Sequence, residues 1–236
     1  TARAVTLEVV QANVWWVVPN ISLDQENNRF TFRTGASEDE VKSPSVDYSF
    51  EIPKGLYSVS SLNALISREC ANLGFDSDYI TLTGDASTQR AVLTFKEAGT
   101  QVDFRASTGV SPYISLGFDQ RLVPASGSTA GQSVEGDRVA VFNTINSFLL
   151  HTSLINNGVP VNATGQQIVC NISITASPGS QINFEPFNPV KTSAANLVGL
   201  AQSRFSVWLT SQDNSEIDTN GEYFAATMVL RWMGPP

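Results

Sequence analysis

Apolar and polar residues alternate with a period of two along much of the chain, which is the pattern of half-buried β-strands. The segments at 29–34, 46–52 and 90–96 show it clearly. Residues 5–18 begin in the same way, but both faces become apolar after Ala12. This change predicts one long strand with a bulge near Ala12 or Asn13. About eleven to thirteen short strands with frequent turn signals predict a sandwich or barrel.

One segment has the helical period instead and predicts a short helix over 60–73. Ser60 is the expected N-cap, and Gly74 is the expected glycine just past the end of the helix. About three turns are not stable alone in water, so we expect the helix to cover an edge or open end of a sheet without a chemical role. Its apolar stripe, interrupted by Glu69, consists of Leu62, Leu65, Ile66, Cys70 and Leu73.

The two ends of the chain and its middle indicate the domain organisation. The first and last strands are both long and rich in apolar residues, so we expect them to be neighbours. A segment rich in Gly and Ser lies between them and predicts an exposed loop at 125–137. The loop would separate an N-terminal β region, 1–124, with the inserted helix and a hairpin, from a C-terminal β region, 138–236. The two regions form either one compact domain or two.

Composition restricts the classes of partner. The 236 residues carry a net charge of −8, and the 14 Lys and Arg residues are scattered. Phosphate binding needs clustered cations, so we expect no nucleic-acid partner. No apolar run is long enough for a membrane-spanning helix. The two cysteines, Cys70 and Cys170, fall in a predicted helix and a predicted strand. We expect buried free thiols, although a bridge between them stays open.

The sequence offers little catalytic or metal-binding chemistry. The single histidine, His151, lies in an apolar strand, where a structural or interface role is favoured over catalysis. Residues 216–222 imitate the start of an EF-hand loop, but Thr227 stands where the bidentate glutamate is required. An ordinary acidic turn is therefore favoured over a calcium site. We expect no cofactor, no metal and no enzymatic activity.

The adjacent pair Trp15 and Trp16 is the candidate interface. Neighbouring residues of a strand point to opposite faces, so one ring should enter the core while the other faces a subunit contact or a second layer. Sugar stacking is the less favoured alternative for the outward ring.

The order of several motifs resembles the minor capsid or penton-like jelly-roll proteins of double-stranded DNA viruses and Polinton-type elements. These motifs are "PNISLDQENNRFTF", "FEIPKGLYSVSSLNALI", "ITLTGDASTQRAVLTF", "ISLGF", "NSFLLHTSLI", "SPGSQINFEPFNP" and "TNGEYFAATMVLRW". The resemblance implies a jelly-roll architecture, either one elaborated jelly roll or two in tandem. It also implies a virion structural subunit that assembles with copies of itself, as a trimer or pentamer, and with other capsid proteins. The alternative is a receptor- or carbohydrate-binding β module of a viral spike.

Overall fold

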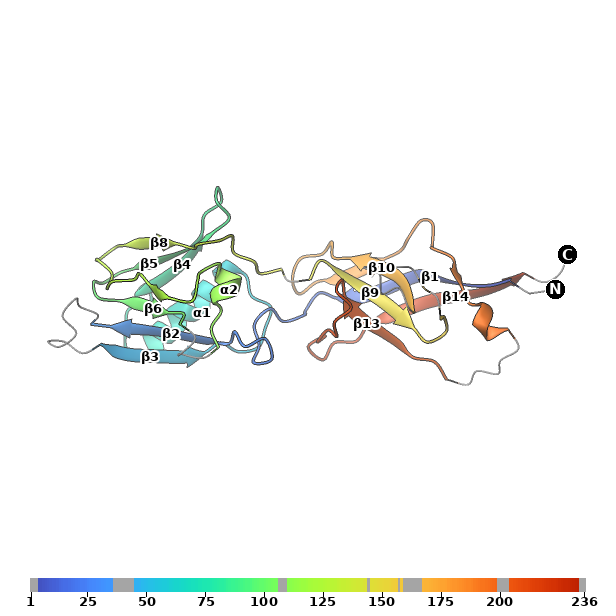
Figure 1. The fold of residues 1–236 in the computed structure, drawn as a ribbon, viewed down its shortest axis with the longest axis horizontal. Coiled ribbons are helices and arrows are strands. Elements are labelled where there is room, and N and C mark those ends of the chain that lie inside the picture. The colour runs from blue at the N-terminus through green and yellow to red at the C-terminus, as the bar shows by residue number, and fades with distance from the viewer. Residues whose placement is uncertain are drawn as a thin grey trace. The chain divides into compact units, whose positions relative to one another are not determined.

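The computed structural model describes residues 4–35, 45–105, 110–143, 145–156, 158, 167–198 and 204–233. The chain divides into two compact units (Figure 1). Unit 1 comprises Thr1–Val18 and Ile145–Pro236, and unit 2 comprises Pro19–Thr144. Unit 2 is therefore inserted into unit 1 directly after its first strand.

Unit 1 is built from two antiparallel sheets. In one sheet, β1 lies in the centre, with β14 along one side and with β11 and β12 along the other. The second sheet has the order β10-β9-β13. The elements of unit 1 are β1 (Ala4–Trp15), β9 (Ser147–Thr152), β10 (Ile168–Ser173), β11 (Gln181–Phe184), β12 (Thr192–Ser193), the 3-10 helix η2 (Ala195–Leu197), β13 (Val207–Ser211) and β14 (Ala225–Met233).

The first and last strands of the chain are neighbours, as the sequence predicts. β1 and β14 pair antiparallel from Ala4 opposite Met233 to Asn13 opposite Ala225. The register shifts between Val9 and Gln11, so the bulge lies slightly before the expected position at Ala12 or Asn13.

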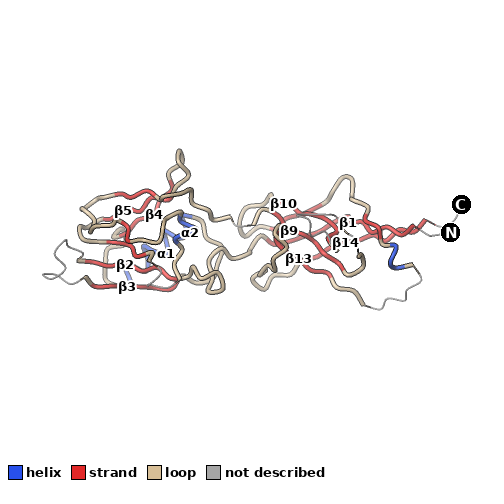
Figure 2. Tube along the Cα trace, viewed as in Figure 1, coloured by secondary structure: helices blue, strands red, loops and turns tan. Residues whose placement is uncertain are grey.

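Unit 2 also contains two antiparallel sheets, with the orders β3-β2-β6-β7 and β4-β5-β8. Apolar side chains from both sheets and from helix α1 form one buried cluster. Figure 2 shows that strands dominate the regular structure of the described residues in both units. The elements of unit 2 are β2 (Arg29–Thr34), β3 (Val46–Glu51), α1 (Val59–Asn72), β4 (Ile80–Gly84), β5 (Ala91–Phe95), β6 (Gln101–Asp103), α2 (Tyr113–Leu116), β7 (Leu122–Val123) and β8 (Ser133–Glu135).

Helix α1 confirms the predicted helix but begins earlier than expected. Its N-cap is Ser58 and not Ser60, because Ser58 and Ser61 form a reciprocal capping box. Gly74 follows the C-cap with φ of +90°, which is the expected use of glycine at that position. Most of the apolar stripe enters the core of unit 2, whereas Leu73 at its end is exposed. The Asn63 side chain accepts a hydrogen bond of 2.7 Å from the Leu82 backbone in β4. The helix is therefore a structural element of the core.

The expected boundary at 125–137 is wrong, because this segment lies inside unit 2. It contains β8, which pairs with β5, and the buried Ser128, whose hydroxyl donates to the Glu97 carbonyl at 2.7 Å. A three-residue strand is too short to show a period of two. Residues 138–143 form no strand. There the Ala140 backbone N–H donates to the Gln89 carbonyl in the turn between β4 and β5, and the Val141 backbone N–H donates to the Ser115 carbonyl in α2.

The predicted all-β, jelly-roll-like class with one short helix near 60–73 is confirmed by these sheets. The four-residue α2 adds one helical turn within a segment that the sequence showed only as short and apolar. Its C-cap, Gly117, has a φ of +75°, and an added Cβ would lie 2.3 Å from the Arg138 carbonyl oxygen. Glycine is therefore required where this turn contacts the 138–143 segment.

Candidate interaction surface

Trp15 is the last residue of β1 and Trp16 follows it directly, and the two side chains point to opposite sides, as expected for neighbours on an extended chain. Trp16 is 3% exposed, and its ring contacts Phe148 of β9 edge to face, with centroids 5.9 Å apart. Its backbone is held by hydrogen bonds with Ser180 and Gly179. Trp15 is 37% exposed. Trp16 is thus the core residue of the pair, and Trp15 is the outward one.

Exposed aromatic side chains are concentrated on unit 1. Among the described residues, every large aromatic that is mostly solvent-exposed belongs to this unit, whereas the aromatic residues of unit 2 are at least partly buried. Phe187 and Tyr223 are 97% and 89% exposed, so their rings contact almost nothing in the chain itself. The exposed aromatics are Trp15, Phe187, Phe205, Tyr223 and Trp232.

This concentration has a physical meaning. Exposing a large ring to water is unfavourable, and aromatic residues are enriched in the buried centres of protein interfaces. Sequence patterns identified Trp15 as one of a pair but gave no signal for Phe187, Phe205 or Tyr223. These three residues lie outside the regular strands, where no period predicts which way a side chain points.

His151 has a structural environment. It is buried in β9, its Nε2 lies 2.8 Å from the Thr210 hydroxyl, and its ring stacks on Trp208 with centroids 5.1 Å apart. Burial lowers the pKa of the imidazole below its ordinary value. The histidine is therefore held neutral between two strands of unit 1.

Acidification is expected to destabilise unit 1 through His151. Because the pKa is lowered on folding, the unfolded chain binds a proton first, and the contribution of the neutral ring to stability is complete above about pH 6.5 and is lost as pH falls from there through the folded-state pKa. His151→Gln should flatten the dependence of the unfolding midpoint between about pH 7.5 and 5.5. Tryptophan fluorescence measures this transition, since all four tryptophans belong to unit 1. An equally steep dependence in the variant would contradict the assignment.

The acidic segment before β14 forms a turn. The Asn220 backbone N–H donates to the Asp218 carboxylate at 2.8 Å, and Asn220 and Gly221 both have positive φ. Thr227, in the position that an EF-hand gives to glutamate, lies in β14. In the described part of the chain, no three His, Cys, Asp or Glu side chains are grouped in a way that could hold a metal ion.

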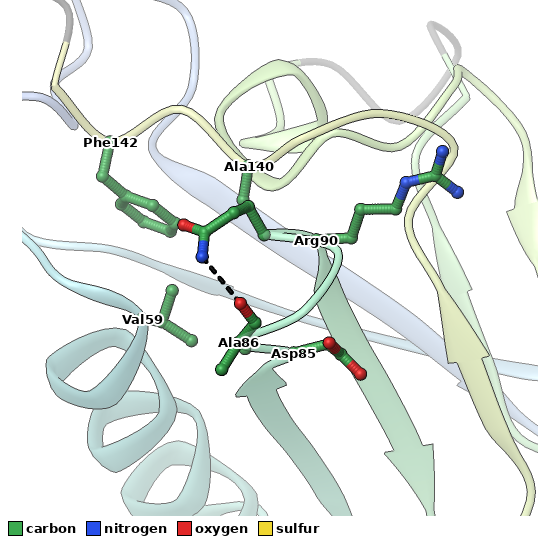
Figure 3. Close-up of a pocket in the computed structure, with 8 residues that line it drawn as sticks. Val59, Asp85, Ala86, Arg90, Ala140 and Phe142 are labelled. Atoms are coloured by element: carbon green, nitrogen blue, oxygen red, sulfur yellow. Dashed lines mark hydrogen bonds between the residues drawn. The ribbon is translucent and has the colours of Figure 1, made fainter.

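A hollow of about 260 Å³ lies in unit 2, beside the start of α1 and the turn between β4 and β5 (Figure 3). Val59, Ala140 and Phe142 surround it, while the Asp85 carboxylate and the Arg90 guanidinium extend in separate directions. Backbone hydrogen bonds from the turn lower the pKa of Asp85. The eight residues that line the hollow include no serine, cysteine, histidine or lysine, so it offers no nucleophile with a base.

Among the described residues of unit 2, one carboxylate is fully buried, that of Asp103 in β6. It accepts hydrogen bonds from Arg105 at 2.6 Å and 3.0 Å, and Arg33 lies 3.6 Å away. Burial alone would raise its pKa, but the hydrogen bonds from Arg105 and the charges of both arginines outweigh burial and lower it. This cluster joins β2 to β6 and is a structural charge site.

No model of a known protein family matches the sequence, and no curated protein matches it either. Among solved structures, the chain is similar to the selenomethionine-labelled mavirus penton protein, with a TM-score of 0.45 and 10% sequence identity. The alignment covers 98% of this chain and 86% of the penton protein. None of the helices in the described residues is long and apolar enough to cross a membrane.

Proposed function

We propose that this chain is a virion structural protein, a capsid or penton-like subunit, that acts by self-association and by packing with other capsid proteins. The observation that carries the proposal is the set of exposed aromatic rings on unit 1. Two units built of antiparallel sheets give such a subunit a rigid framework, and the ordered motifs of the sequence resemble those of penton-like jelly-roll proteins.

Trp15 is the proposed anchor of one interface. A stable contact between subunits buries on the order of 800 Å² on each partner, with aromatic residues near its centre. The proposed assembly is a closed ring of three or five copies, in which each subunit presents one surface to a different surface of the next. Other capsid proteins would pack around the ring in the virion.

The proposed function is tested by sedimentation of the purified chain, alone and mixed with its proposed capsid partners. We expect a concentration-dependent oligomer alone and incorporation into larger particles in the mixture. A chain that stays monomeric at high concentration and joins no particle would refute the proposal. If this monomer bound a defined glycan in an array, the carbohydrate-binding alternative would replace it.

A further inference from the structure

β14 is an edge strand with unusual features for an exposed edge. Within the described residues it pairs with β1 alone, so the backbone groups on its outer side have no strand partner there. Exposed edges are normally blocked by prolines, short length or several charges. β14 has nine residues, no proline and one charged side chain, Arg231. That arginine is tied to its own sheet by an Nε contact of 3.1 Å with Glu8.

Apolar residues on the inner face of the sheet are also exposed at this edge. Leu230 and Trp232 lie opposite Leu7 and Val5 of β1, so their side chains share the inner face of the sheet. The β1 partners are buried, with Leu7 1% and Val5 9% exposed. On β14, by contrast, Leu230 is 43% and Trp232 70% exposed. The apolar inner face thus continues onto β14, where the described chain leaves Leu230 and Trp232 only partly covered.

We propose that β14 is a contact between two copies of this chain, whose β14 strands pair antiparallel about a two-fold axis at Val229. In this register Thr227 faces Arg231 of the partner subunit, so the single cation does not meet its own copy. The large Trp232 faces the small Ala226 of the partner subunit across the inner row. The register therefore keeps the two cations apart and places a large side chain opposite a small one.

This register selects a second copy as the occupant. A two-fold contact places the inner rows of both strands on the same side, so each copy extends the uncovered inner face of the other. It also pairs both β14 edges at once, so neither β14 strand is left open to further strand addition.

The contact rests on the proposed function and adds to it. A ring contact joins copies into one closed assembly but does not link one ring to another. A shell needs at least one other kind of contact, and the two-fold pairing of β14 supplies one between copies.

Disulfide cross-linking of the full chain tests the register. Val229→Cys places two cysteines opposite each other, with Cα atoms about 4.5–5.5 Å apart, within disulfide reach. Thr227→Cys is the matched control, because the two copies of that residue would lie four positions apart, about 13 Å along the strands. The native thiols are buried, and burial raises the pKa of Cys70 to about 11 and of Cys170 to about 12, so they should not react.

We expect mild oxidation to cross-link the Val229→Cys protein into a disulfide dimer and to leave the Thr227→Cys protein uncross-linked. Equal cross-linking of the two variants, or none in either, would overturn the inference.

Charge at position 227 gives a second and independent test. Thr227 is exposed and faces the neutral Gln11 within its own sheet, so substitution there should not unfold unit 1. Thr227→Glu would place a carboxylate opposite Arg231 of the partner subunit, twice per pair, and Thr227→Lys would place a like charge there. We expect the first to tighten the dimer and the second to weaken it, each by about twofold to thirtyfold in Kd.

These results separate the contact from the proposed function. If sedimentation shows an oligomer that both variants at 227 leave unchanged, β14 is not the contact, while self-association stands. If the unmodified chain is a monomer at every concentration and joins no particle, both proposals fail.

Discussion

Trp16→Ala is expected to unfold unit 1, whereas Trp15→Ala should leave it folded and weaken self-association. Trp16 is buried against Phe148, and removing a buried tryptophan costs about 3–5 kcal/mol through lost burial and the cavity left behind. Trp15 is more than one-third exposed, so its loss should cost the fold little. Because Trp15 is the proposed interface anchor, its removal should weaken association by about 2 kcal/mol or more, which is roughly thirtyfold in Kd.

The two variants are matched controls, because they remove the same side chain from adjacent positions at the end of β1. Fluorescence of the three remaining tryptophans measures the unfolding of unit 1, and sedimentation measures association. If Trp15→Ala assembles as tightly as the unmodified chain, Trp15 is not an anchor. If Trp16→Ala is as stable as the unmodified chain, the account of the core of unit 1 is wrong.

Strands with a clear local period could be predicted from the sequence. β2, β3 and β5 occupy nearly the expected residues, because alternation of apolar residues is a property of the strand itself. The stripe of α1 was equally visible. Its N-cap was misplaced because Ser58, Ser60 and Ser61 are all plausible caps in sequence, and only backbone geometry shows which hydroxyl accepts the first hydrogen bonds.

The division into units could not be read from local pattern. Unit 1 joins the first strand to the last part of the chain across an insertion of more than one hundred residues, and no local signal encodes that distance. The first and last segments of unit 2 are joined by the buried Asn20 side chain. It hydrogen-bonds the backbone of Tyr57 and the Phe142 carbonyl. Nothing in the sequence around residue 20 identifies these partners.

The candidate surface was only partly predictable for the same reason. Adjacency alone established that Trp15 and Trp16 face opposite sides. Which of them is buried depends on Phe148, a residue far along the chain. The uncovered Leu230 and Trp232 share one face of their strand in the sequence, but their exposure depends on the extent of the opposite sheet.

Asp103→Ala is expected to destabilise unit 2 by about 3–5 kcal/mol while leaving unit 1 folded. Asp103 is fully buried, and the Arg33 side chain is 12% exposed, so removal of the carboxylate leaves a mostly buried cation with its inner partner missing. Asp47→Ala is the matched control, because Asp47 also pairs with Arg33, at 3.1 Å, but is 56% exposed. An exposed ion pair of this kind contributes at most about 1 kcal/mol.

The pH dependence makes this prediction specific to the charge of Asp103. Because the pKa of Asp103 is lowered on folding, its contribution to stability is complete above about pH 4, the ordinary value of an aspartate, and is lost as pH falls through the folded-state pKa. The difference in unfolding free energy between the unmodified chain and Asp103→Ala should therefore shrink as pH falls from about 5 to 3. Far-UV circular dichroism reports both units, while tryptophan fluorescence reports unit 1 alone. A difference that stays constant with pH would show that Asp103 stabilises β2 and β6 by packing and not by its charge.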